Sequence, residues 1–311
     1  MPTHAWANRV CSSVLCVLLL MTVLSACTAS GGGGSPPTTI WIVDDISVST
    51  CPLSGEEVER DCTVRAPTDQ APGERLPVIV LLHGFGGTPG GERASGGWDD
   101  AVVANRFVLV TPGGQHDGWN AGGCCGLAQS LGIDDVGYLA WLISWVRGLP
   151  IVDPGRVGLV GFSNGGMMAD LFACLRPDLI ATVASLAGPL MAGCPGGPGV
   201  PLLQMHGTAD EVVPFHGGLS PTFPLISPEF PDIPTMTAQM AADAGCAGDP
   251  VVATTGDITS TRWDACPAGR AVELAELTGW FHVWPHTVDV DATQLVLQHA
   301  GIVAPTPTPE T

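Results

Sequence analysis

The sequence predicts an α/β protein whose doubly wound, mostly parallel sheet is flanked by helices. Six short apolar runs, often rich in Val, Ile and Leu and bounded by Gly or Pro, are typical of buried parallel strands. They cover residues 76–83, 106–111, 156–161, 180–186, 200–206 and 271–277. Apolar side chains at helical spacing predict helices between and after these runs, at 134–148, 165–175, 235–244 and 291–300. Strands that alternate with helices in this way build a doubly wound sheet.

Composition restricts the function before any motif is considered. The 311 residues include 30 acidic side chains and 11 basic ones, all of them Arg, so the formal net charge is −19. A nucleic-acid-binding protein needs a basic stripe, which this sequence lacks, and the acidic excess repels polyanionic substrates. We therefore expect a neutral substrate and no nucleic-acid partner. The metal-ligand spacing Cys-x-x-Cys is absent from the sequence, and we expect neither a metal nor a cofactor.

The N-terminus predicts export and lipid anchoring. Residues 1–26 have the layout of a secretory signal, with Arg9, no acidic residue and an apolar run too short to span a membrane comfortably. The run ends in Leu24-Ser25-Ala26-Cys27, which resembles a bacterial lipobox, where cleavage precedes a Cys that is then lipidated. A plain cleavage site followed by an accidental Cys is the alternative. We expect a protein anchored by Cys27 to the outer face of the bacterial cytoplasmic membrane, or in part secreted.

The remaining chain divides by composition. Residues 27–39 form a Gly/Ser/Pro-rich tether behind the lipidated cysteine. Residues 40–303 contain all the predicted strands and helices without an internal repeat, and we expect one catalytic domain and a monomer. Residues 304–311 are a Pro/Thr segment without a core face, which we expect to be disordered.

The cysteines predict a disulfide-stabilised domain. Of 11 cysteines, two lie in the signal segment and one is Cys27, which leaves eight, an even number typical of disulfides in an exported protein. Three pairs would each close a short loop: Cys51 with Cys62, Cys174 with Cys194, and Cys246 with Cys266. For the adjacent Cys124 and Cys125, the sequence leaves open a vicinal disulfide, two buried thiols or pairing with other cysteines.

A candidate nucleophile follows the apolar run 156–161. Gly161-Phe162-Ser163-Asn164-Gly165 matches G-x-S-x-G, which is a weak signal by itself in a chain with 41 Gly. Its position between a predicted strand and a predicted helix is a stronger one, because that sharp turn exposes a serine above an α/β-hydrolase sheet. We predict that Ser163 is the nucleophile, and a Gly-rich turn without a catalytic role is the alternative.

A serine hydroxyl needs a base, and the base needs a carboxylate that fixes its tautomer. In an α/β-hydrolase these follow the serine in the order acid, then histidine. Asp210 comes just after a predicted strand and is the predicted acid, with Glu211 as the fallback and a turn-capping Asp as the alternative. His282 follows the last predicted strand and is the predicted base, ahead of His286.

Other residues are expected to meet the substrate. The backbone N–H groups of Asn164 and Phe85 are the predicted donors to the oxyanion, with Gly84 as an alternative to Phe85. Trp119 and Trp280 flank the motifs and could form an apolar substrate rim, for which core packing is the alternative. The Pro- and Phe-rich segment 214–234 is expected to form one wall of the cleft.

Several motifs together carry a family resemblance. They are His83-Gly84-Phe85-Gly86-Gly87, Gly118-Trp119-Asn120-Ala121-Gly122-Gly123-Cys124-Cys125-Gly126, Asp134-Asp135-Val136-Gly137, Gly161-Phe162-Ser163-Asn164-Gly165-Gly166-Met167-Met168, His206-Gly207-Thr208-Ala209-Asp210 and His282-Val283-Trp284-Pro285. Residues 60–300 resemble secreted poly(3-hydroxybutyrate) depolymerase and feruloyl esterase-like α/β-hydrolases, related to carbohydrate esterase family 1, in their lipoprotein branch. The resemblance implies the triad Ser163, Asp210 and His282. The bulky Trp280 and Phe281 depart from the usual Gly-rich approach to the histidine, so the shape of the acyl pocket does not carry over.

These observations predict an extracytoplasmic serine esterase that works through an acyl-enzyme. Its expected substrates are neutral esters of the hydroxybutyrate, feruloyl or acetyl type, polymeric or small. An α/β serine peptidase is the alternative enzyme, although the sequence has no separate propeller domain. A catalytically silent binding lipoprotein of the same fold is the alternative without an activity.

Overall fold

The computed structural model describes residues 40–56 and 58–304. The predicted signal segment, the lipidated Cys27 with its tether, and the tail from residue 305 onward lie outside the described residues, and these remain predictions. Within 40–56 and 58–304, no helix combines the length and the apolar character needed to cross a membrane.

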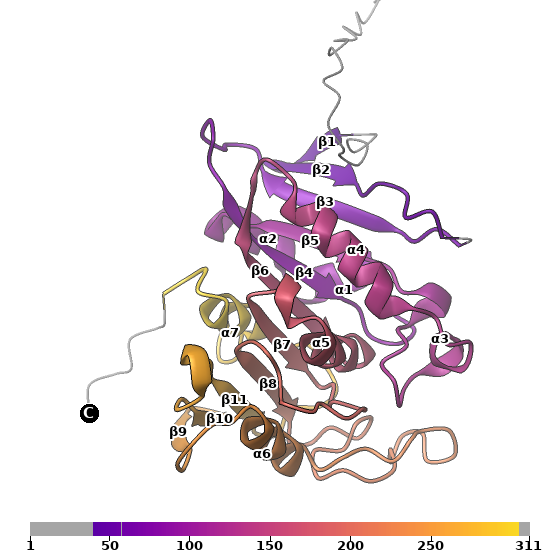
Figure 1. The fold of residues 1–311 in the computed structure, drawn as a ribbon, viewed down its shortest axis with the longest axis vertical. Coiled ribbons are helices and arrows are strands. Elements are labelled where there is room, and N and C mark those ends of the chain that lie inside the picture. The colour runs from indigo at the N-terminus through magenta and orange to yellow at the C-terminus, as the bar shows by residue number, and fades with distance from the viewer. Residues whose placement is uncertain (1–39, 57, 305–311) are drawn as a thin grey trace, which may run out of the picture. The chain divides into compact units, whose positions relative to one another are not determined.

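A single sheet of 11 strands organises the described residues, in the order β1-β2-β3-β5-β4-β6-β7-β8-β11-β10-β9 (Figure 1). The central strands from β5 to β11 pair in parallel. Antiparallel strands extend the sheet at both edges, with β1, β2 and β3 at one and β10 and β9 at the other. The strands are β1 Ile40–Val43, β2 Ile46–Thr50, β3 Cys62–Pro67, β4 Leu76–Leu82, β5 Val108–Pro112, β6 Val152–Phe162, β7 Thr182–Leu186, β8 Leu202–Gly207, β9 Val251–Thr255, β10 Ile258–Trp263 and β11 Val272–Leu277.

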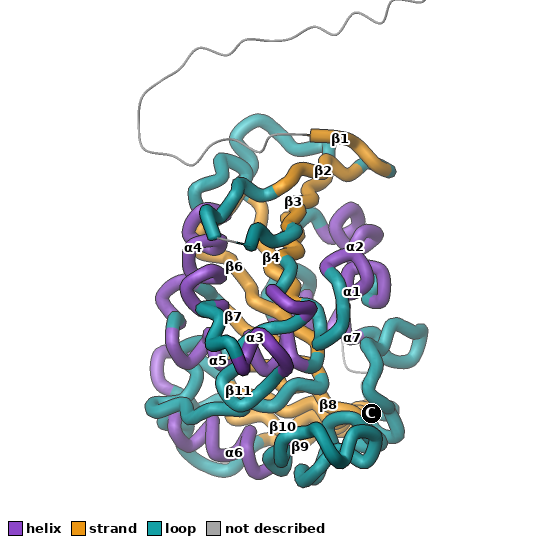
Figure 2. Tube along the Cα trace, turned by 90° about the vertical axis from the view of Figure 1, so that its right-hand side faces the viewer, coloured by secondary structure: helices purple, strands orange, loops and turns teal. Residues whose placement is uncertain are grey.

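Helices cover both faces of the sheet, with α4, α5 and α6 on one side and α1, α2 and α7 on the other (Figure 2). Alternation along the strands makes both faces apolar. In β4, Val78 and Val80 pack into the core under α4 and α5, whereas Ile79 and Leu81 pack with residues of α2 and α7. The helices are α1 Pro89–Ser95, α2 Trp98–Asn105, α3 Gly126–Ser130, α4 Asp135–Arg147, α5 Asn164–Leu175, α6 Ile233–Asp243 and α7 Ala292–His299.

The predicted α/β-hydrolase architecture is confirmed, and each predicted strand and helix has a counterpart in the structure. The antiparallel strands and helices α1 to α3 were not predicted. β9 is exposed at every residue, so it lacks the buried apolar run that predicted the central strands. β2 alternates between buried and half-buried positions instead of forming a continuous apolar run.

Four disulfides cross-link the described chain. Three are the loop-closing pairs expected from the sequence, Cys51–Cys62, Cys174–Cys194 and Cys246–Cys266. The fourth joins the neighbours Cys124 and Cys125, which selects the vicinal disulfide among the states that the sequence left open.

Candidate active site

Ser163 occupies the sharp turn between β6 and α5. Its backbone has φ 53° and ψ −122°, a positive-φ conformation that costs a non-glycine residue strain and is concentrated at functional sites. The neighbouring glycines have no room for a side chain. A Cβ on Gly161 would collide with the backbone of Gly165, and a Cβ on Gly165 would collide with the carbonyl oxygen of Leu82. This is the strand-turn-helix geometry that presents a serine above the sheet.

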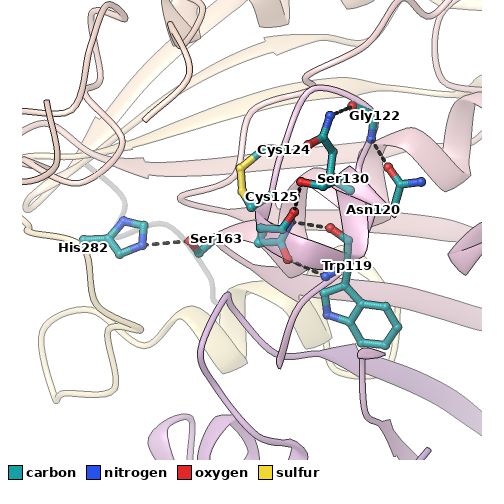
Figure 3. The surroundings of a disulfide bond; sticks show 11 residues. Trp119, Asn120, Gly122, Cys124, Cys125, Ser130, Ser163 and His282 are labelled. Carbon is teal, nitrogen blue, oxygen red and sulfur yellow. Dashed lines mark hydrogen bonds between the residues drawn. A yellow bond between two sulfur atoms is a disulfide. The ribbon is translucent and has the colours of Figure 1, made fainter. Parts of the chain in front are cut away.

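The three residues of the predicted triad meet beside this turn. Ser163 Oγ lies 3.0 Å from Nε2 of His282, and Nδ1 of the same imidazole lies 2.7 Å from Oδ2 of Asp210 (Figure 3 shows the first contact). Asp210 follows β8 and His282 follows β11, and because these strands are parallel neighbours, both loops leave the same edge of the sheet. An ionised carboxylate only accepts hydrogen bonds, so Nδ1 of His282 carries the proton and Nε2 is left to accept the serine proton.

The surroundings of Asp210 keep its carboxyl ionised. The side chain is completely buried. Burial by itself would raise the pKa, but hydrogen bonds from His206, His282 and the backbone N–H of Val213 outweigh it and hold the pKa of Asp210 well below its ordinary value. Oδ1 accepts the N–H groups of Val212 and Val213, each at 2.8 Å.

His206, in β8, is a second histidine on the same carboxylate. Its Nε2 lies 2.8 Å from the carbonyl oxygen of Val213 and 3.4 Å from Oδ2 of Asp210. Both of these neighbours are acceptors, so the proton sits on Nε2. The ring is fully buried, and its Nδ1 has no hydrogen-bond partner among the described residues. The sequence reasoning did not assign His206 a role, although its spacing of four residues from Asp210 was visible.

Backbone donors for an oxyanion come from two loops. Asn164 is the first residue of α5, where a backbone N–H has no acceptor within the helix. In the loop after β4, the Phe85 N–H remains the predicted second donor, with the Gly84 N–H as the alternative. The backbone of Gly84 also lowers the pKa of Glu92, a buried residue of α1 that the sequence reasoning did not identify.

The side chain of Asn164 ties the nucleophile turn to the loop before α3. Its Oδ1 accepts the N–H of Trp119 at 2.7 Å, and its Nδ2 donates to the Trp119 carbonyl at 3.0 Å. The indole N–H of Trp119 donates to the carbonyl of His83 at 2.9 Å, and the ring is fully buried. Trp119 is therefore a core residue, and its expected place on a substrate rim is wrong.

A cavity of about 780 Å³ opens over Ser163 and His282. It is lined by Gly84, Phe85, Gly123, Cys124, Cys125, Gly126, Gln129, Phe162, Ser163, Met167, Val212, Val213, Ser220, Phe223, Ile226, Ser227, Pro228, Phe230 and His282. The segment 214–234 contributes a wall, as expected from the sequence. Trp280 is not part of the lining; it is half-buried and packs against the core on the α2 and α7 side of the sheet.

The alternative site residues lie elsewhere. His286, the second choice for the base, pairs with Asp291 at 3.2 Å and does not line the cavity. A larger cavity of about 1080 Å³ is lined by residues 50–53 and 59–63 and by part of α4, and it contains none of the triad residues. Within residues 40–56 and 58–304, no group of three or more His, Cys, Asp or Glu side chains is arranged to hold a metal ion.

Comparison with known sequences identifies relatives. Residues 56–215 match the model of the family "Esterase: Putative esterase". The chain is 33% identical over 231 residues to "Putative esterase NocK" of Nocardia uniformis subsp. tsuyamanensis, an alignment that covers 68% of this chain and 66% of that protein. It is 29% identical over 234 residues to "Feruloyl esterase B" of Piromyces equi, covering 72% of this chain and 42% of that protein. The matched region is thus less than two thirds of each relative's length.

Comparison with solved structures identifies the fold. The acetyl xylan esterase from Aspergillus awamori superposes with a TM-score of 0.58 at 15% identity, covering 78% of this chain and 94% of that chain. An S-formylglutathione hydrolase from Agrobacterium tumefaciens gives a TM-score of 0.53 at 13% identity, covering 86% and 99% of the two chains. At these identities the likeness shows the α/β-hydrolase fold alone.

Proposed function

Because this chain belongs to the esterase family whose model it matches, we propose that it hydrolyses neutral carboxylic esters with a Ser163, His282 and Asp210 triad. One observation carries the proposal. A continuous line of hydrogen bonds runs from Ser163 Oγ through His282 to a buried carboxylate, and its serine end opens into a cavity.

The geometry supports acyl transfer in two steps. Ser163 Oγ attacks the ester carbonyl carbon while Nε2 of His282 takes its proton, and the Phe85 and Asn164 N–H groups stabilise the oxyanion. The intermediate collapses as the protonated imidazole gives its proton to the leaving alcohol, which leaves an acyl-serine. A water molecule, deprotonated by the same imidazole, then releases the acid and restores the serine. Asp210 holds the ring in the tautomer that both steps need.

The cavity favours a neutral, largely apolar ester. Among the described residues that line it, His282 is the only one with an ionisable side chain, and Asp, Glu and Arg are absent. The acidic excess of the whole chain also disfavours anionic substrates. Relatives named for feruloyl esters and a structural neighbour named for acetyl xylan make aromatic and short aliphatic acyl groups the first candidates. The family resemblance adds hydroxybutyrate esters, including the polymer.

The triad is tested by labelling and by paired substitutions. Wild-type protein should hydrolyse p-nitrophenyl acetate and bind a fluorophosphonate at Ser163. Ser163→Ala and His282→Ala should each remove most of kcat, and the double variant should lose little more than either single one, because the residues act as a unit. His286→Ala is the matched control and should keep normal turnover. A Ser163→Ala variant with unchanged kcat would refute the mechanism.

We also propose that the protein acts outside the cytoplasm, anchored through lipids on Cys27. The support is the lipobox-like sequence ending in Ala26-Cys27 and the polar tether that follows. Several acyl chains are needed, because one chain binds a membrane only marginally. Cys27→Ala should move the protein from the detergent phase to the aqueous phase while its esterase activity stays the same. Equal partitioning of both proteins would refute the anchor.

A further inference from the structure

The Cys124–Cys125 disulfide is one of the surfaces that enclose the candidate active site. Both cysteines line the cavity that contains Ser163 and His282. In Figure 3, the bond between the two sulfurs lies beside Ser163, on the side away from His282. The three other disulfides contribute no residue to this cavity. The vicinal pair therefore forms part of the wall of the cavity that contains Ser163.

Hydrogen bonds fix the loop that carries this pair. Asn164 binds both the N–H and the carbonyl of Trp119. The side chain of the next residue, Asn120, donates from Nδ2 to the carbonyl oxygen of Ile133 at 2.9 Å. Its backbone N–H donates to a carboxylate oxygen of Asp135 at 2.6 Å.

Hydrogen bonds within the loop and from α3 close the turn around the disulfide itself. The N–H of Ala121 donates to the Cys124 carbonyl at 2.7 Å, and the N–H of Cys125 donates to the Trp119 carbonyl at 3.3 Å. Gln129, from α3, reaches back to the carbonyl of Gly122 at 3.4 Å. Hydrogen bonds from the nucleophile turn, from α4 and within the loop therefore fix its conformation. The two sulfur atoms form a rigid part of the cavity wall.

The chemistry of that face suits a flat apolar group. Two bonded sulfur atoms present a polarisable surface without a hydrogen-bond donor, and sulfur makes favourable contacts with aromatic rings. Phe223, Ile226 and Phe230 also line the same cavity. A rigid wall also loses little conformational entropy when a ligand binds, which favours affinity.

We propose that the Cys124–Cys125 disulfide is a specificity-determining contact surface, which holds the aromatic acyl group of an ester while Ser163 attacks its carbonyl. This inference rests on the proposed esterase function and adds the residues that would select the acyl group. It requires that removal of the sulfurs weaken binding of aromatic acyl esters while hydrolysis of acetyl esters continues.

The test uses two esters that share one leaving group, p-nitrophenyl acetate and p-nitrophenyl cinnamate. For Cys124→Ala/Cys125→Ala we expect hydrolysis of the acetate to continue, with a smaller change in kcat/KM than for the cinnamate. For the cinnamate we expect KM to rise and kcat/KM to fall roughly tenfold, the lower end of what a lost apolar contact costs in an enzyme pocket. The control, Cys246→Ala/Cys266→Ala, removes a disulfide that does not line the cavity and should leave the cinnamate-to-acetate ratio unchanged.

Other outcomes separate a contact surface from a scaffold. An equal fall in kcat on both esters would show that the disulfide acts only by positioning Asn164 and its oxyanion donor, and would overturn the proposal. An unchanged ratio would overturn it as well. Failure of wild-type protein to react with a fluorophosphonate would instead refute the esterase function itself.

A measurement on wild-type protein covers the case in which the double variant does not fold. Dithiothreitol donates two electrons and two protons to a disulfide, giving two thiols and its own cyclic disulfide, by thiol–disulfide exchange. Alkylation and peptide mapping then identify a dose at which Cys124 and Cys125 are reduced. At that dose the cinnamate-to-acetate ratio of kcat/KM should fall and should recover on reoxidation. A constant ratio at full reduction of this pair would overturn the proposal.

Discussion

Replacement of Glu92 by Gln should stabilise the protein above neutral pH. Glu92 is only 8% exposed, and its Oε1 has no hydrogen-bond partner among the described residues. Burial raises the pKa of this carboxyl to about 7, and the hydrogen bond from Gly84 offsets only part of that effect. The folded protein must therefore bury a poorly compensated charge once Glu92 ionises.

The size of the effect follows from the difference between the folded and unfolded pKa values. An unshifted Glu has a pKa of 4.5, so the folded value of about 7 lies above it. The protonated carboxyl is then favoured by folding, and its contribution is fully present below about pH 4.5 and is lost as the pH rises through about 7. At 1.36 kcal/mol for each pKa unit, the loss is about 3 kcal/mol. Gln cannot ionise and keeps an oxygen for the Gly84 N–H.

Urea denaturation at pH 5 and pH 8.5 measures this difference. The free energy of unfolding of Glu92→Gln should exceed that of wild type by about 2.5 kcal/mol more at pH 8.5 than at pH 5, since part of the contribution is already lost at pH 5. Glu229→Gln, which changes an exposed carboxyl, is the matched control and should track wild type at both pH values. If the free energies of unfolding of Glu92→Gln and wild type differ by the same amount at both pH values, the Glu92 carboxyl does not have the raised pKa that its burial predicts.

Two further changes test the site and the fold. His206→Leu removes a hydrogen-bond donor from Asp210, so the pKa of that carboxyl should rise. We expect kcat to fall about tenfold, and the acid limb of the pH–rate profile to move to higher pH. His206→Gln retains a donor and should restore much of kcat and much of the original acid limb. If His206→Leu and wild type give the same pH–rate profile, His206 does not position Asp210. Cys246→Ala/Cys266→Ala opens a bridge with a sequence separation of 20 and should lower the free energy of unfolding by about 3 kcal/mol, as measured in urea. An unchanged urea midpoint would contradict that contribution.

Local patterns in the sequence were enough for the central architecture. The parallel strands are buried on both faces, and their continuous apolar runs stand out from the chain. The turn at Ser163 could be predicted because its glycines and the strand before it are neighbours in sequence. The edge strands could not be predicted in this way, since β9 has no buried face and β2 and β3 alternate.

The sequence predicted that Ser163, Asp210 and His282 share a site, and only the tertiary structure decided among the alternatives that the sequence left open. It brings His282 rather than His286 to Ser163, and it places His206 on the carboxylate of Asp210. It also moves Trp119 from a rim into the core, because Asn164 binds the backbone of that residue. These contacts join positions from four to 119 residues apart. A sequence pattern records which side chains share one strand or helix, whereas packing between elements sets which loops meet at the edge of the sheet.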